Sequence, residues 1–388
     1  MKTWNKNFTL LASAVFGMGM FFGIQFALFY NFINDVIHIN PDELGYMEGL
    51  RETPGFLNAL FIAATMYLAP PIIGGISLVV MGLGMVAYSQ VSTVPGVVVF
   101  SLIWSIGFHC WTPLQSAMTL AYSPGDEKGK PLGQLRSVES FATMGAILLC
   151  LFFINKLEFG GMFIIGGLAV VIGGILVMFA SRNLIGTLRE SRFVLKKRYN
   201  LYYLLSFLQG CRKQMFMTFA IFLLVNAFDT NRDTIIKLVL INQFMIFATS
   251  SLMGKLVDRW GERIMLSASY IGLFFVSIGY ALIREVNTLY VLYCIDNLIF
   301  VGGIALTTYL NKIAPPEDIK PTLAMGVSMN HIASVIVPLI GGAVWKALGY
   351  DVVFLGGAAI AAASIIVTQW MKPERVVSEK IQPEIAGK

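Results

Sequence analysis

The stretch from residue 8 to residue 34, FTLLASAVFGMGMFFGIQFALFYNFIN, contains no Asp, Glu, Lys or Arg, and it decides the fold class. A bilayer core about 30 Å thick is crossed by a helix of roughly 20 mostly apolar residues. Lys2 and Lys6 precede the run, as in a secretory signal peptide, but the run is long and lacks a clear small-residue cleavage site. We therefore predict that this segment is a first membrane span that stays in the protein.

Similar apolar segments follow along the whole chain. The sequence is 56% hydrophobic and only 13% charged, whereas a soluble domain carries about 25% charged residues. The fold predicted is an all-α membrane protein with twelve transmembrane helices, arranged as two pseudo-symmetric six-helix halves. We expect these helices at about 8–34, 41–69, 71–90, 94–121, 131–155, 160–181, 199–228, 232–256, 263–283, 287–312, 322–346 and 350–371.

Basic residues are concentrated on one side of this layout. The side assigned to the cytoplasm holds most of the Lys and Arg residues, and the opposite side holds only Lys156, Arg232, Lys237, Arg284 and Lys346. Cytoplasmic loops carry such an excess, so both termini are predicted to be cytoplasmic. The net charge of +6 lies in short loops and forms no stripe or arm. It therefore indicates contacts with anionic lipid, and nucleic acid is not an expected partner.

A basic segment near the middle of the chain separates two halves. Residues 182–198 carry six basic side chains and one acid, as a solvated cytoplasmic linker would. A shift of 191 residues places the loop at 123–127 on the loop at 314–318, so the halves have related loops and spans. The predicted domains are an N-terminal bundle at 1–181, the basic linker at 182–198, a C-terminal bundle at 199–371 and a cytoplasmic tail at 372–388.

One loop carries a more specific pattern. Between the eighth and ninth spans the chain reads Gly254-Lys-Leu-Val-Asp258-Arg259-Trp-Gly261-Glu-Arg263. This resembles the G-x-x-x-D-R-x-G-x-R loop of the major facilitator superfamily. The resemblance implies a cytoplasmic latch, with Asp258 facing the positive end of a neighbouring helix and Arg259 and Arg263 held at the headgroups. The alternative is a charged turn that only sets topology.

The chain departs from this family's patterns in two places. The corresponding loop of the first half, residues 67–74, has no charged residue, so a latch is expected in one half only. The fifth span reads Ser140-Phe-Ala-Thr-Met-Gly-Ala-Ile-Leu-Leu149 and lacks the G-x-x-x-G-P-x-x-G-G pattern of multidrug antiporters. Drug efflux is therefore an alternative function and not the first one.

Ionisable residues inside spans are costly, and they mark candidate functional sites. Arg212 and Lys213 lie near the middle of the seventh span, with Gln209 one turn before them. A cationic group lining a cavity would attract an anionic substrate. The alternative is that these cations pair with acids on other helices and hold the bundle together.

The second span holds a mixed cluster. Glu48, Arg51 and Glu52 have the spacing of helical neighbours. Two adjacent carboxylates favour protonation of one of them, which suits a proton-coupling site, and Arg51 opposes this. A self-neutralised cluster at the outer mouth is the alternative.

The remaining candidates are distributed over both halves. Glu139, Asp296 and His109 are proposed as further proton-coupling residues, and Gln25, Asn330 and His331 as substrate-binding residues. The alternative for Asp296 is an ion pair with Arg212 or Lys213. Arg136 is the expected charge partner of Glu139, as Arg51 is of its neighbouring acids. For each histidine, a hydrogen-bonded packing role is the alternative.

No motif of an enzyme, cofactor site or metal site is present, and the four cysteines form no CxxC pair. The function predicted is secondary active transport of a small organic anion or zwitterion by alternating access, with proton coupling. The expected partners are a small-molecule substrate, H⁺ and the lipid bilayer. We expect a monomer in a prokaryotic cytoplasmic membrane. Proton-driven drug efflux and a membrane-embedded lipid-handling protein are the alternatives.

Overall fold

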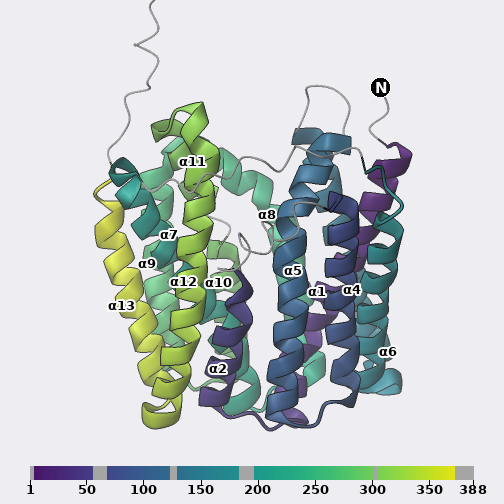
Figure 1. The fold of residues 1–388 in the computed structure, drawn as a ribbon. Helices are drawn as coiled ribbons and strands as arrows, with labels where there is room; N and C mark the ends of the chain where they lie inside the picture. The colour runs from purple at the N-terminus through teal and green to yellow at the C-terminus, as the bar shows by residue number, and fades with distance from the viewer. Residues whose placement is uncertain (1–3, 56–67, 123–128, 183–195, 301–303, 372–388) are drawn as a thin grey trace, which may run out of the picture.

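The computed structural model describes residues 4–55, 68–122, 129–182, 196–300 and 304–371, and these residues are helical almost throughout (Figure 1). Its helices are α1 Lys6–Asp35, α2 Pro41–Glu52, α4 Pro70–Ala87, α5 Val94–Tyr122, α6 Gly129–Val177, α7 Asn200–Gln214, α8 Arg232–Trp260, α9 Glu262–Leu282, α10 Val286–Phe300, α11 Ile304–Ile313, α12 Pro316–Leu348 and α13 Tyr350–Thr368. Two π-helical segments, Met215–Ala220 and Leu223–Ala227, extend α7.

The predicted all-α membrane fold is confirmed. Among the described helices, seven are long and apolar enough to cross a membrane by length and composition alone. The helix α6 accounts for two predicted spans, because Glu158 has a backbone φ of 55° that breaks it. Residues 56–67 of the predicted second span, 183–195 of the linker and the tail at 372–388 lie outside the described residues.

Local signals explain where individual helices begin. The backbone N–H of Asn40 donates to the Glu43 carboxylate at 2.9 Å, and Pro41 begins α2. Gly261 has φ +80° between α8 and α9, a conformation that glycine adopts without strain. Each of these positions lies between two consecutive helices.

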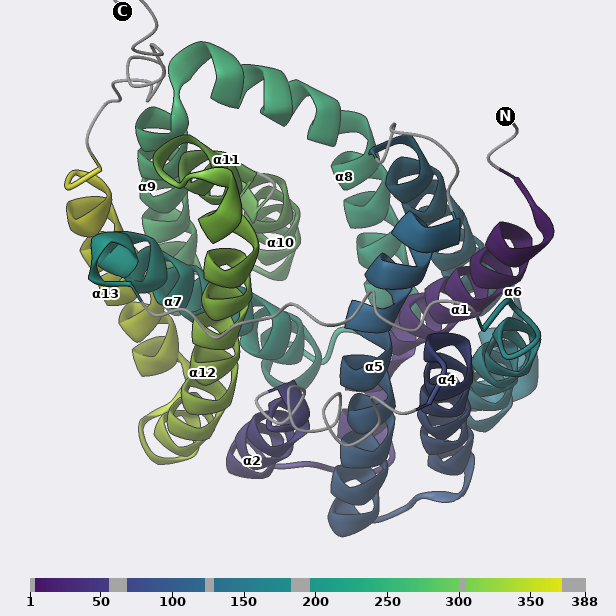
Figure 2. The ribbon, with the colours of Figure 1, turned by 45° about the horizontal axis from the view of Figure 1, so that its top comes forward.

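The start of α1 and the end of α13 lie at the same end of the molecule, the top in Figure 1. We call this the upper end and the opposite one the lower end. The helices α1, α4, α5 and α6 pack mainly on one another, with α6 along α1 and α4 (Figure 2). The helices α7 and α9 to α13 pack likewise, with α13 along α9 and α12 along α7, whereas α2 lies mainly along α12 and α8 contacts both sets. We call α1 to α6 the N-terminal helices and α7 to α13 the C-terminal helices.

The two sets of helices meet closely at the lower end. Here α2 lies along α12. A Cβ atom added at Gly45 would lie 2.2 Å from the carbonyl oxygen of Pro338, and one at Gly342 would lie 2.4 Å from that of Pro41. Such an approach of two backbones is possible only with glycine.

Polar contacts reinforce this lower-end closure. The Lys346 ammonium lies 2.8 Å from the Asp42 carboxylate, and the Asn226 amide donates to Asn34 at 2.9 Å. Arg232 donates to Asn155 at 2.7 Å. Each of these pairs joins an N-terminal to a C-terminal helix, so the contacts hold the lower end shut.

At the upper end, charged residues tie the C-terminal helices to one another. Asp318 at the start of α12 accepts hydrogen bonds from Lys196 at 2.6 Å and Tyr199 at 2.7 Å, and it also pairs with Arg198. The end of the basic linker is thereby attached to α12.

We predict that Gly342→Ala weakens the lower-end closure, because the new methyl group would displace the backbone of α2. The expected loss in unfolding free energy is about 1–3 kcal/mol, read from thermal unfolding of the purified protein in detergent. The matched control is Gly356→Ala in α13, where an added Cβ meets nothing within 4 Å. Equal melting temperatures for the two variants would contradict the proposed backbone contact.

Candidate functional site

A cavity of about 310 Å³ lies between the N-terminal and C-terminal helices. Its walls come from α1, α2, α5, α6, α7, α8 and α12. The charged and titratable lining residues are Arg51, Glu52, His109, Arg136, Glu139, Lys213 and His331. Apolar lining comes mainly from Met18, Phe22, Phe26, Trp104, Phe108 and Met217.

The cluster on α2 forms one wall of this cavity. The Arg51 guanidinium pairs with the Glu48 carboxylate and lies 3.4 Å from that of Glu52, as the spacing of the three residues predicts. It also lies over the Trp104 ring, 5.2 Å from the centroid. The Ser105 hydroxyl donates to the Arg51 carbonyl oxygen, so α5 positions this turn of α2.

The acids of this cluster also contact the C-terminal helices. The Gln214 amide of α7 lies 3.5 Å from the Glu48 carboxylate, and Nδ1 of His331 of α12 lies 3.2 Å from that of Glu52. Glu48 is 1% exposed and Glu52 9% exposed. The interface between the two sets of helices therefore has paired charges at its centre.

The π-helical extension of α7 adds a further contact across the interface. A π-helical turn is wider than an α-helical turn and changes the backbone pairing, and such turns are frequent at functional sites. The Tyr30 hydroxyl of α1 donates to the Met217 carbonyl oxygen within this segment. The backbone of this π-helical segment thus contacts the N-terminal helices. No residue pattern in the sequence predicted the segment.

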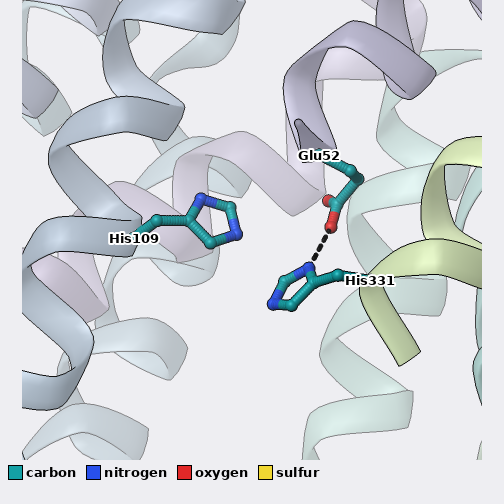
Figure 3. Close-up of side chains that lie close together, drawn as sticks. All are labelled: Glu52, His109 and His331. Atoms are coloured by element: carbon teal, nitrogen blue, oxygen red, sulfur yellow. Dashed lines mark hydrogen bonds and ion pairs between the residues drawn. The ribbon is translucent and has the colours of Figure 1, made fainter. Parts of the chain in front are cut away.

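The two histidines named from the sequence are brought together. The rings of His109 and His331 lie with their centroids 4.9 Å apart. Figure 3 shows both rings and the Glu52 carboxylate converging from α5, α12 and α2. The two histidines are separated by more than 200 residues in the chain, so sequence spacing gave no sign of this cluster.

Arg212 and Lys213 lie in different surroundings. Arg212 is 5% exposed, and its guanidinium lies 3.3 Å from the Asp296 carboxylate of α10. These two residues line a small cavity of about 10 Å³ within the C-terminal helices. Lys213, about 100° further around the helix, lines the large cavity instead. The structure thus pairs Arg212 with Asp296, which was the alternative to substrate contact.

The other candidate residues also fall into two groups, those that line the large cavity and those that do not. Glu139 lines the cavity and pairs with Arg136 at 3.1 Å, and Gln25 lines it as well. Within the described structure, Oε1 of Gln25 is buried and accepts no hydrogen bond. Gln209 and Asn330 are half-buried and are not among the residues that line the cavity.

Sequence reasoning missed several lining residues. Gln214 directly follows Lys213, and its position in a charged run could have identified it. Gln243 of α8 and the neighbours Trp104 and Ser105 of α5 lie in uncharged stretches and give no comparable signal.

A second, more apolar cavity of about 170 Å³ adjoins the first. The two share Phe26, Met217 and Gln243 in their walls. The second is lined by aromatic rings, including Phe216 and Tyr293, and by the amides of Asn242 and Asn297. The ring planes of Phe216 and Tyr293 are stacked with centroids 5.1 Å apart. A charged compartment therefore lies beside an aromatic one.

The loop predicted as a latch makes contacts at the upper end. Arg263 donates to the Gln369 side chain at 2.9 Å beyond the end of α13, and Glu262 pairs with Lys312 of α11 at 2.9 Å. Arg259 is exposed, and Gly254 lies within α8. The side chain of Asp258 lies outside the described part, so its contact with a helix end stays a prediction.

A central polar cavity between two sets of membrane helices is typical of secondary transporters, and the comparisons with known proteins agree. The sequence profile described as Major Facilitator Superfamily matches residues 9–307 and 202–387. The chain therefore belongs to the major facilitator superfamily. A search of curated protein sequences gives no match.

Solved structures share this fold at low sequence identity. A mutant form of the nucleoside transporter NupG has a TM-score of 0.79 at 14% identity, covering 95% of this chain and 100% of that chain. A POT family transporter in complex with 5-aminolevulinic acid has a TM-score of 0.70 at 13% identity, covering 93% of this chain and 94% of that chain. A D-xylose-proton symporter has a TM-score of 0.69 at 15% identity, covering 95% of this chain and 97% of that chain.

We predict that the Arg212–Asp296 pair contributes to stability as a unit. Arg212→Met alone leaves the Asp296 carboxylate buried without its guanidinium partner, and should cost about 3–5 kcal/mol of unfolding free energy. The double variant Arg212→Met, Asp296→Leu should recover most of this loss in thermal unfolding. Equal stability of the single variant and the unmodified protein would contradict the structural role of this pair.

Proposed function

We propose that the protein is a secondary active transporter for a small organic anion or zwitterion, coupled to protons and operating by alternating access. The observation that supports this most strongly is the central cavity between the two sets of helices, which holds cations and carboxylates together. Rocking of two halves around a fixed central site is the general mechanism for such architectures.

The formal charges of the cavity lining balance when Glu48 is counted with them and the histidines are neutral. Arg51, Arg136 and Lys213 are offset by the lining acids Glu52 and Glu139 and by Glu48, which does not line the cavity but pairs with Arg51. A buried site disfavours unpaired charge, so a zwitterion can enter without further compensation. A monoanion would bring one negative charge, which uptake of one proton would compensate. This is the physical reason for proposing proton coupling.

Lys213 is the proposed contact for the anionic group of the substrate. It lines the cavity from α7, whereas Arg51 is already engaged by two carboxylates. The adjoining aromatic cavity could receive the apolar or planar part of the same molecule. The 5-aminolevulinic acid named for one similar transporter is a zwitterion, and this supports the proposed substrate class.

Glu48 is the proposed proton carrier. Its carboxylate contacts Arg51 on its own helix and Gln214 on the opposite set of helices. Protonation would weaken its attraction to Arg51 and free that guanidinium for the entering anion. Glu139 faces the cavity beside Arg136, and Asp296 is held by Arg212, so both are less directly linked to the interface.

The closed lower end and the charge bias of the sequence support an inward-facing state. From the positive-inside rule we expect the basic upper end to face the cytoplasm, together with both termini. With α2 and α12 in contact below, substrate would exchange with the cytoplasm from this conformation. The proposed domains, an N-terminal bundle at 1–181 and a C-terminal bundle at 199–371, would be the two rocking units.

Drug efflux is the second candidate, and the aromatic cavity is the observation in its favour. Large apolar drugs are bound mainly by aromatic and aliphatic surfaces, and the second cavity offers these. The paired charges of the larger cavity favour a small charged substrate instead.

We predict that Lys213→Ala lowers substrate affinity at least tenfold. Arg51 and Arg136 are paired with carboxylates, whereas Lys213 is a lining cation for which the described residues show no ion pair. Ligands would be identified by thermal shift with amino acids, 5-aminolevulinate and small carboxylates, using a nucleoside and a sugar as neutral comparators. Lys237→Ala is the matched control, since Lys237 is exposed on α8 outside the cavity. Equal loss in both variants, or stronger binding of neutral compounds, would contradict the proposal.

We predict that Glu48→Gln separates exchange from accumulation. In proteoliposomes, exchange of labelled for unlabelled substrate should continue, because the neutral amide mimics the protonated carboxyl. Accumulation driven by a pH gradient should be lost. If Glu48→Gln still accumulates substrate against its gradient at the unmodified rate, Glu48 is not the proton carrier.

A further inference from the structure

We propose that Glu52, His109 and His331 form a binding site for one divalent transition-metal ion of the zinc type. One possible ligand atom from each residue lies within 4.8 Å of the others. The three residues come from α2, α5 and α12 and converge in one place (Figure 3). All three also line the large cavity, so an ion could reach them from there.

The donor set fits this class of ion. Zinc in proteins is bound by imidazole nitrogen and carboxylate oxygen, and two histidines with one glutamate form a known three-residue set. Calcium and magnesium prefer oxygen ligands only, so this site should discriminate against both of them. Three protein ligands would leave a further position on the metal for water or another ligand from the cavity.

The orientation of His109 supports ligation. Its Nδ1 lies 2.9 Å from the Ser105 carbonyl oxygen, which accepts a hydrogen bond when Nδ1 carries the proton. That tautomer leaves Nε2 with a lone pair, and Figure 3 shows this side of the ring directed toward Glu52 and His331. A metal-bound histidine usually donates its other N–H group to a carbonyl or carboxylate in this way.

The packing around His331 also favours one orientation of its imidazole ring. A Cβ atom added at Gly55 would lie 2.6 Å from Nδ1 of His331, so glycine at this position leaves room for the imidazole. The same Nδ1 lies 3.2 Å from the Glu52 carboxylate. A metal ion could replace this direct contact with two metal–ligand bonds.

Neighbouring cations oppose metal binding and set its strength. Arg51 lies 3.4 Å from the Glu52 carboxylate, and Lys213 lines the same cavity. Glu48 offsets Arg51 through their direct ion pair. We therefore expect a weaker site than a structural zinc site, which has no such cations beside it.

Occupation of the site would affect the transport cycle. His331 belongs to the C-terminal helices, and Glu52 and His109 belong to the N-terminal helices. A bound ion would bridge the two sets and stabilise the conformation that holds these ligands together. Zinc should therefore raise the melting temperature and slow the alternation between states.

The test is titration of the full-length, metal-free protein with Zn²⁺ in detergent, after removal of any histidine tag. Isothermal calorimetry and thermal shift should both show one site, with no response to Mg²⁺. His109→Gln and His331→Gln should each weaken Zn²⁺ binding at least tenfold. His38→Gln is the matched control, because His38 lies at the lower end outside the cavity.

Two results would overturn the site: unchanged Zn²⁺ binding in both histidine variants, or equal loss in the His38→Gln control. Melting temperatures without metal show whether each variant folds. As a readout that needs no variant, Co²⁺ added to the unmodified protein should give visible absorption bands that Zn²⁺ abolishes, and their absence would also overturn the site. These assays contain no substrate, so their outcome is separate from that of the proposed transport function.

Discussion

The pairing of charge inside an apolar environment is the constraint on which this structure depends. A charged side chain in a membrane interior is tolerated where a partner compensates it or where it faces a water-filled cavity. Arg51 meets this condition by its contacts with Glu48 and Glu52, and Arg212 by its contact with Asp296. The first group lies at the interface between the two sets of helices, and the second lies within one set. This difference in position separates a site that can change during transport from one that stabilises a bundle.

Contacts at the interface connect this charge cluster to the conformation of the whole molecule. Gln214 and His331 from the C-terminal helices reach the two acids on α2. Below them, Gly45 and Gly342 allow α2 and α12 to touch along their backbones. Separation of the lower end would pull α12 away from α2, and so would disturb the contact between His331 and Glu52. Binding at the cluster and closure of the lower end are therefore physically linked.

The sequence predicted the fold well because hydrophobic length is a local property. The apolar runs and the helical spacing of Glu48, Arg51 and Glu52 are local patterns that can be seen directly in the sequence. Contacts between helices that are distant in the chain could not be predicted in this way. Arg212 was the first candidate for substrate contact because it is charged and central, and the structure decides between that role and its pairing with Asp296 of α10. The cluster of Glu52, His109 and His331 depends on three helices far apart in the chain.

The π-helical extension of α7 was equally invisible, since no residue type specifies it. A single-sequence pattern identifies which residues are costly to bury, and the tertiary structure decides which of them share a cavity. Lys213 and Arg212 illustrate this point, because one step along the helix separates a cavity wall from a buried ion pair.

The central claim is that a balanced set of charges couples one proton to one anion. Its most direct test is the count of protons taken up per substrate molecule in proteoliposomes, with a pH-sensitive dye inside and labelled substrate outside. The account predicts one proton per monoanion. Transport of an anion without any proton movement would contradict it.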